Sequence, residues 1–311
     1  MKASNGAPFD PKIVFGLIAF GALAFFATLY FIGTNQTGGD INDGGAHAAG
    51  KGLTGFAAFA DFLESEGHDV VVSRSKGGLD DYGLLVLTPP SYADAEDIDA
   101  ILDDRLYQGP TMVILPKWDT LPLSYFESAD AEDGWVQLYD ARAPIWADEL
   151  SGHRALDVTL AGEKDGNVAR WGGLDTRGQL PSGVIQSARG ELTSLIFGSR
   201  GGTIVGYVGN DNDYPDLANA NGVSTSDNDA TYYMHPVIFV VDPDLINNYG
   251  FAQRANAEVA HRLVDMLVGD NAQPVVFDLT LNGLGAQQNL LTLAFRPPFL
   301  AATLCLILAL L

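Results

Sequence analysis

Continuous apolar runs alternate with amphipathic stretches in two parts of the chain. Strands without polar alternation are buried on both faces, as in parallel sheets covered by helices. The amphipathic stretches follow the helical period of 3.6 residues or carry an acidic face. We therefore predict an α/β fold with a doubly wound, mostly parallel sheet, with strands over 69–73, 84–87, 111–115, 237–241 and 275–279 and helices over 53–66, 93–107 and 255–268.

This alternation of apolar runs and amphipathic stretches is interrupted between about residues 118 and 228, where Trp, Gly and Pro separate short β-like pieces. We expect a β-rich insertion in this region, with pieces at 135–139, 155–160, 192–197 and 203–208. Pattern alone leaves open whether the insertion is a separate subdomain or adds strands to the same sheet.

Residues 13–32 carry no charge over twenty positions. At about 1.5 Å per residue, such a helix crosses a hydrocarbon layer of about 30 Å. A cleaved signal peptide is the alternative, but its apolar region is usually only about 7–15 residues and ends at a small-residue cleavage site. We predict a transmembrane helix, and Lys2 and Lys12 before it predict a cytoplasmic tail over 1–12 with the large domain on the other side.

The C-terminal residues 299–311 are also wholly apolar, but thirteen residues are too few to span a bilayer comfortably. One interpretation is a hydrophobic helix packed on the domain. We favour the start of a second transmembrane helix over 297–311, after Pro297 and Pro298. Residues 33–49, rich in Gly, Asn and Asp, are predicted to be a linker, which leaves a soluble domain over 50–296.

The net charge of −22 argues against nucleic-acid binding, because an acidic surface repels phosphates. Acidic clusters are typical of a solvated surface, although cation binding is an alternative. Cys305 is the only cysteine, so the chain can form neither an internal disulfide nor a cysteine metal cluster. It also leaves the predicted soluble domain without a cysteine nucleophile.

Motifs for catalysis or cofactor binding are incomplete. Residues 45–52 approach the phosphate-binding loop, but Gly52 follows Lys51 where that motif needs Ser or Thr, and no strand precedes it. There is no G-x-S-x-G elbow, and the five histidines lack the i, i+4 pairing of a helical zinc site. Residues 211–216 and 227–229 offer oxygen ligands for calcium, but Pro215 replaces the fifth ligand of the helix–loop–helix calcium loop. We expect no cofactor, no metal ligand and no assignable catalytic residue.

One loop stands out because it directly follows the predicted strand over 237–241. Ligands of open α/β sheets bind at the carboxyl ends of strands. Asp242, Asp244, Asn247 and Asn248 are therefore candidates for binding a ligand or partner, with Asp244 and Asn247 expected to be partly exposed beside a crevice. The alternative is ordinary turn and cap chemistry.

Four segments together resemble the bacterial membrane proteins called domain of unknown function 4350. They are residues 52–59 (GLTGFAAF), 71–74 (VVSR), 240–248 (VVDPDLINN) and 277–283 (FDLTLNG). The resemblance implies a flavodoxin-like or glutamine-amidotransferase-like α/β domain between two membrane spans, in proteins often encoded near MoxR-type ATPases. The amidotransferase relatives use a cysteine, which this domain lacks, so the resemblance transfers no site.

Two functions remain open. The first is a non-enzymatic binding or scaffold domain of the bacterial envelope, held at the inner membrane bilayer with the domain outside the cytoplasm. Its expected partner is a protein, and the resemblance implies a MoxR-type ATPase assembly. The second is an envelope hydrolase that uses Asp242, Asp244 or Asp278 for acid–base chemistry. A carboxylate in a deep pocket would favour the hydrolase, whereas a shallow crevice would favour binding.

Overall fold

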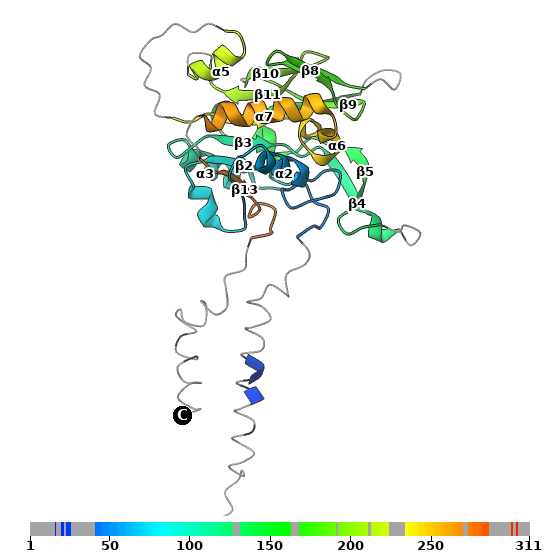
Figure 1. Cartoon of the computed structure of the whole chain (residues 1–311), viewed down its shortest axis with the longest axis vertical. Helices are drawn as coiled ribbons and strands as arrows, with labels where there is room; N and C mark the ends of the chain where they lie inside the picture. The colour runs from blue at the N-terminus through cyan, green and yellow to red at the C-terminus, as the bar shows by residue number, and fades with distance from the viewer. Residues whose placement is uncertain are drawn as a thin grey trace, which may run out of the picture. The chain divides into compact units, whose positions relative to one another are not determined.

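The computed structural model of the chain describes residues 16, 20, 21, 23–25, 41–126, 131–162, 168–190, 192–210, 213–223, 234–269, 273–285, 300 and 303. Contacts divide the chain into two compact units, one over residues 41–285 and one formed by 1–40 and 286–311. The first unit begins at Ile41, so residues 41–49 of the predicted linker are part of the folded domain. The rest of the description concerns this domain (Figure 1).

The structure contradicts the prediction of a transmembrane helix over 13–32. Among the described residues, no helix is long and apolar enough to cross a membrane. Of the predicted span, only six residues are described, and the others lie outside the described part of the chain. The same holds for the predicted second span over 297–311, of which only residues 300 and 303 are described.

One half of the main sheet is parallel, as the apolar runs predict. Its strand order is β1-β13-β2-β3-β12, and each neighbouring pair is parallel. Alternate residues of β2 pack into two different apolar clusters, so this strand is buried on both faces. The strands are β1 (Val70–Ser73), β2 (Leu84–Leu87), β3 (Thr111–Ile114), β12 (Val237–Val240) and β13 (Val275–Asp278).

The other half of the same sheet is antiparallel, which corrects the prediction of a mostly parallel sheet. The insertion continues the order beyond β12 as β11-β10-β7-β8, while β9 pairs with both β11 and β6, giving eleven strands in all. An open edge at β12 would leave backbone groups unpaired, and antiparallel pairing with β11 satisfies them. These strands are β6 (Asp157–Gly162), β7 (Arg170–Gly173), β8 (Thr176–Gln179), β9 (Val184–Arg189), β10 (Leu192–Gly198) and β11 (Thr203–Val208).

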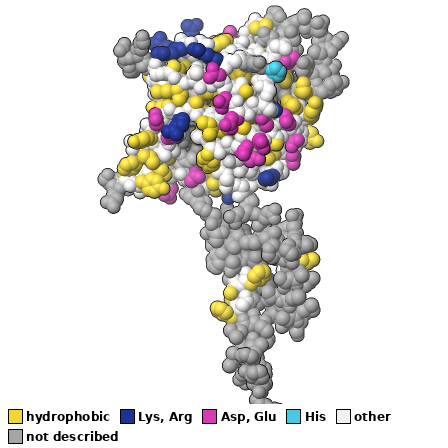
Figure 2. Space-filling view, turned by 180° about the vertical axis from the view of Figure 1, so that it is seen from behind, with side chains coloured by type: hydrophobic (Ala, Val, Ile, Leu, Met, Phe, Trp, Pro, Cys, Tyr) yellow, Lys and Arg dark blue, Asp and Glu magenta, His cyan; other side chains and the backbone are white. Residues whose placement is uncertain are grey.

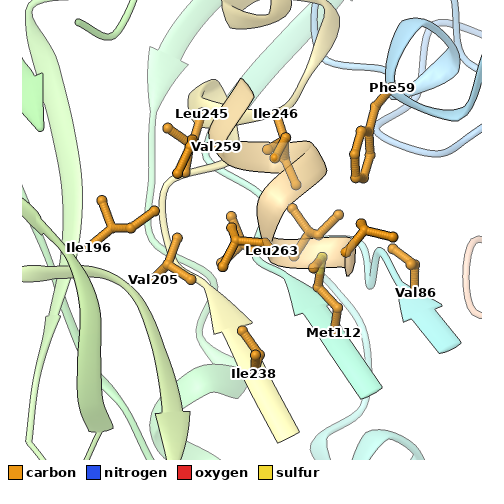
Figure 3. Close-up of a cluster of buried hydrophobic side chains, with 14 of the residues drawn as sticks. Phe59, Val86, Met112, Ile196, Val205, Ile238, Leu245, Ile246, Val259 and Leu263 are labelled. Carbon is orange, nitrogen blue, oxygen red and sulfur yellow. The ribbon is translucent and has the colours of Figure 1, made fainter. Parts of the chain in front are cut away.

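Helices cover both faces of the sheet. On one face, α2 (Ala57–Ser65) and α7 (Arg254–Val268) bury apolar side chains such as Phe59 and Leu263 against the strands (Figure 3). On the other face, α3 (Ala95–Arg105) and α4 (Trp146–Glu149) do the same. Each large apolar side chain that is fully buried contributes about 1.5–3 kcal/mol. The short helices are α5 (Pro215–Ala220), α6 (Asn248–Phe251), η1 (Lys76–Asp80), η2 (Leu123–Tyr125), η3 (Gly152–Arg154) and η5 (Pro243–Leu245).

A separate two-stranded hairpin follows β3. It consists of β4 (Trp118–Pro122) and β5 (Val136–Ala141), which pair antiparallel and appear at the lower right of the domain in Figure 1. The hairpin begins where β3 leaves the sheet, so it lies at the carboxyl end of the parallel strands.

Gly67 follows α2 as its C′ residue, directly after the C-cap residue Glu66. Gly67 has φ of +101°, a left-handed conformation that favours glycine. Its amide donates to Glu64 O at 3.1 Å, and the amide of His68 donates to Leu63 O at 3.0 Å. This pair of bonds is a Schellman motif, which fixes the backbone of residue 68.

Candidate functional site

The loop after β12, residues 242–247, is buried inside the domain. Asp242 and Asp244 are each 0% exposed, and Asn247 is 1% exposed. The expectation that Asp244 and Asn247 are partly exposed beside a crevice is therefore wrong. Asp242 acts as the N-cap of η5 and accepts a hydrogen bond from the amide of Asp244 at 3.0 Å.

A fully buried lysine pairs with both carboxylates. Lys117 Nζ lies 3.0 Å from each carboxylate oxygen of Asp242 and 2.7 Å from Asp244 Oδ2. Its ammonium also donates to the carbonyl oxygen of Val184 at 2.7 Å. We call Lys117, Asp242 and Asp244 the buried lysine cluster. The sequence signal for Lys117 is a single cation two residues after the apolar run over 111–115.

Side chains from distant elements complete the cluster. The backbone amide of Gln186 in β9 donates to Asp242 Oδ2 at 2.8 Å. Trp118 Nε1 donates to Asp244 Oδ1 at 2.7 Å, and Asn247 Nδ2 donates to the same oxygen at 2.9 Å. Because each carboxylate oxygen accepts at least two hydrogen bonds, the charges are solvated by the protein itself.

Burial and charge set the protonation of the cluster. Burial lowers the pKa of Lys117, but the neighbouring carboxylates of Asp242 and Asp244 outweigh that effect, so its pKa is raised above the ordinary value. Burial raises the pKa of Asp242 to about 6; Lys117 opposes this effect, and the negative charge of Asp244 adds to it. One buried cation thus faces two carboxyl groups, and protonation below about pH 6 removes the negative charge of Asp242.

Asn248 ties the loop to the start of α2. Its Oδ1 accepts a hydrogen bond from the amide of Ala58 at 2.9 Å, in the first turn of the helix. Its Nδ2 donates to the carbonyl oxygens of Gly50 and Gly52 at 3.0 and 2.7 Å. The residue before α2, Phe56, cannot cap the helix with its own side chain, so Asn248 performs that task from a distant part of the sequence.

The carboxylates named for a hydrolase do not face solvent. Asp278 is 2% exposed, and its oxygens accept from Thr280 Oγ1 at 2.8 Å and from the amide of Leu281 at 3.0 Å. Asp242 and Asp244 are held in the buried lysine cluster. In this conformation, none of the three can reach a substrate in solution.

A pocket of about 300 Å³ lies beside the cluster, at the carboxyl ends of β2, β3 and β13. We call it the carboxyl-edge pocket. Trp118 belongs to its wall, and Asp244 orients this side chain through the indole nitrogen. Lys117 Nζ also lies 5.2 Å from the centre of the Trp118 ring. The pocket is lined by Asp43, Gly45, Ala46, His47, Thr54, Pro90, Ser91, Tyr92, Pro116, Trp118, Asp119, Thr120 and Asn282.

A carboxylate–imidazole pair, Asp43 and His47, forms part of the pocket lining. His47 Nε2 lies 2.8 Å from Asp43 Oδ1, which also accepts a hydrogen bond from the amide of Gly45 at 2.7 Å. His47 is 2% exposed, and its Nδ1 atom is buried without a hydrogen-bond partner. The predicted linker therefore supplies functional groups to the carboxyl-edge pocket.

The β4–β5 hairpin exposes apolar and aromatic side chains next to this pocket. Tyr125 is 76% exposed, Tyr139 74% and Trp135 49%. A second pocket of about 300 Å³ lies between the hairpin and residues 51–53. Apolar side chains gather at the lower left of the domain in Figure 2, where the hairpin lies. We call Leu121, Tyr125, Phe126, Trp135 and Tyr139 the aromatic hairpin surface.

The glycine-rich segment that approaches a phosphate-binding loop has another physical role. A Cβ atom on Gly55 would lie 1.9 Å from Gly50 O, so the two turns can approach only where glycine is present. Lys51 is exposed at the surface. Of the predicted calcium ligands, residues 211, 212 and 227–229 lie outside the described residues.

Comparison with known proteins gives one match. The model of a family described as "Domain of unknown function (DUF4350)" matches residues 51–264. This confirms the family resemblance, over a shorter range than the whole chain. No curated protein and no solved structure was found to match.

Proposed function

Because the chain belongs to the DUF4350 family, whose description names no activity, we infer its function from the site. We propose that the domain is a non-enzymatic binding module for a polypeptide partner. The recognition surface consists of the carboxyl-edge pocket and the aromatic hairpin surface. The partner presents apolar side chains to the hairpin and a basic side chain to the pocket.

The exposure of several aromatic side chains on one hairpin carries this proposal. Tyr, Trp and Phe are enriched at protein interfaces and frequently supply most of the binding energy. The hairpin pairs with no strand of the main sheet in the described part of the chain. Aromatic residues on such an element contribute little to the core, which is consistent with a role in binding.

The charge of the pocket favours a basic group on the partner. Asp43 and Asp119 line the pocket, and their side chains are 49% and 40% exposed. Asp119 Oδ2 also lies 3.2 Å from Arg142 Nη2, and such an exposed ion pair contributes little to stability. The chain as a whole carries a net charge of −22, so long-range attraction also favours a basic partner.

The buried lysine cluster holds one wall of this surface, the side chain of Trp118, in place. Asp244 fixes the indole of Trp118 through a 2.7 Å hydrogen bond, and Trp118 begins β4. A rigid wall reduces the entropy lost on binding, which increases affinity. Asp242 and Asp244 thus serve as positioning residues for the site, and neither contacts the partner.

The alternative hydrolase has less support. It needs a carboxylate within hydrogen-bond reach of the substrate, whereas Asp242, Asp244 and Asp278 are at most 2% exposed. The pocket does hold two partly exposed carboxylates, but Asp43 is paired with His47 and Asp119 with Arg142. Binding is therefore the function that the site supports best.

Site-specific photo-crosslinking tests the proposal. A photoreactive amino acid replaces Tyr139 in the full chain expressed in its native cells, and crosslinked proteins are identified by mass spectrometry. We expect one polypeptide to be captured. Tyr107 is the matched control, because it is 68% exposed and follows α3, on the other side of the domain in Figure 1.

The captured partner is then used in a binding assay. Trp135→Ala is expected to weaken its affinity at least tenfold, about 1.4 kcal/mol, and higher salt is expected to weaken it further. Equal capture from Tyr107, or unchanged affinity for Trp135→Ala, would contradict the proposal. A MoxR-type ATPase among the captured proteins would support the ATPase assembly that the family resemblance implies. That assembly stays a prediction.

A further inference from the structure

A second group of polar side chains lies away from the carboxyl-edge pocket. Among the described residues, ligand atoms of His68, His261 and Asp265 all lie within 4.8 Å of one another. Asp265 Oδ1 is 3.2 Å from His68 Nε2 and 3.6 Å from His261 Nε2. Two imidazole nitrogens thus face one carboxylate oxygen.

The fold holds these three side chains in place from two separate segments. His261 and Asp265 are one turn apart on α7, so their side chains lie on the same face of the helix. His68 follows α2, where the Schellman motif at Gly67 fixes its backbone. The ring of Phe62 packs against His261, with ring centres 5.9 Å apart.

Two of the three ligand-atom separations are close to those of a tetrahedral transition-metal site. Zinc binds histidine nitrogen and carboxylate oxygen at about 2.0–2.2 Å, so tetrahedral ligand atoms lie about 3.3–3.5 Å apart. The two measured separations, 3.2 and 3.6 Å, need only small adjustments to reach this range. Two nitrogens and one oxygen select a borderline divalent ion such as Zn²⁺ over calcium or magnesium.

We propose that His68, His261 and Asp265 form a binding site for one Zn²⁺ ion. The three side chains provide three ligands, and water completes the coordination. The side chain of Asp265 is 51% exposed, so an ion can enter from solvent. Bound metal joins the turn after α2 to α7 and stabilises the packing of these two helices on the sheet. This site is independent of the proposed partner surface.

Metal titration of the purified full chain tests the site. The protein carries an affinity tag without histidine and is treated with a chelator before Zn²⁺ is added in a calorimeter. We expect one ion to bind per chain and the melting temperature to rise in its presence. Cobalt(II) provides a second measurement, since its visible spectrum reports nitrogen and oxygen coordination.

Single substitutions locate the ion. His68→Asn, His261→Asn and Asp265→Asn are each expected to weaken Zn²⁺ affinity at least tenfold and to remove the rise in melting temperature. His153→Asn is the matched control, since this histidine is exposed and lies on η3. Melting temperatures measured with chelator show whether each variant is folded.

Two outcomes would overturn the proposal. One is the absence of Zn²⁺ binding to the folded wild-type protein. The other is unchanged affinity in all three variants, which would place any bound ion elsewhere. If one variant fails to fold, the remaining two still decide the assignment.

Discussion

Two groups of polar residues at the same edge of the sheet have different environments. The loop after β12 is covered by β9, whose residues Val184 and Gln186 contribute backbone groups to the buried lysine cluster. The carboxyl ends of β2, β3 and β13 are not covered in this way and line the carboxyl-edge pocket. Position at a strand's carboxyl end therefore does not by itself make a residue part of a binding site.

Energetics explain why the two groups respond differently to mutation. Charges removed from water are tolerated only when hydrogen bonds and opposite charges surround them. Lys117 is the cation that both carboxylates share, so its removal leaves two buried carboxyl groups without an opposite charge. Exposed pocket residues such as Asp43 and Asp119 retain water as an alternative partner, so they have little effect on folding.

The largest effect is expected for Lys117→Met. This change leaves Asp242 and Asp244 buried without their cation, and breaking a buried pair costs about 3–5 kcal/mol. Denaturant unfolding of the variant measures the loss in free energy of unfolding. Lys51→Met is the control, because Lys51 is exposed. A loss below about 1 kcal/mol for Lys117→Met would show that the cluster does not stabilise the fold.

The pH dependence of stability tests the protonation of Asp242. Its pKa is about 6 in the folded domain, against about 3.9 in an unfolded chain. A raised pKa favours the protonated folded state, so this contribution is complete below about pH 4 and is lost as pH rises through 6. We expect a loss of up to about 3 kcal/mol.

Comparison with Asp242→Asn isolates this contribution, because the amide does not ionise. The difference in unfolding free energy between wild type and variant should decrease between about pH 4 and pH 7. A constant difference across this range would show that Asp242 remains ionised throughout.

A smaller effect is expected for Asn248→Ala, which removes the cap of α2 and the bonds to Gly50 and Gly52. Loss of a cap costs about 1–2 kcal/mol, measured by thermal or denaturant unfolding. Asn248→Asp keeps the acceptor for Ala58 but loses the donors, so it should retain part of the stability. Equal losses in both variants would show that the cap itself contributes nothing.

The smallest effect is expected for Ser91→Ala in the carboxyl-edge pocket. Its hydroxyl lines the pocket, and changes at such positions usually alter stability by less than about 0.5 kcal/mol. Unfolding measurements should show no difference from wild type. A loss of more than about 1 kcal/mol would place Ser91 in the structural framework and remove the contrast with the buried lysine cluster.

Sequence patterns located most of the strands and helices. The five apolar runs correspond to β1, β2, β3, β12 and β13, and the three amphipathic stretches correspond to α2, α3 and α7. These elements are predictable because burial on one or both faces imposes a local period of hydrophobicity. Strands of the insertion were harder to locate, since β7 and β8 are short, rich in glycine and lack an apolar run.

The candidate site was predicted less well than the fold. The loop at 242–248 is a structural centre of the domain, but its burial depends on β9, which is far away in sequence. Lys117 was missed because a lone lysine is usually exposed. His261 and Asp265 have helical i, i+4 spacing, but a pattern of paired histidines does not include them, and their third neighbour, His68, is remote in sequence.

The sequence by itself determined the α/β class, the main core elements and the acidic surface, because each follows from local composition or period. Only the tertiary structure decided how the insertion joins the sheet, which carboxylates are sealed, and which residues meet at the two candidate sites. The physical reason is that hydrogen bonding at a strand edge and the desolvation of a charge depend on whichever distant segment covers them. No local pattern identifies that segment.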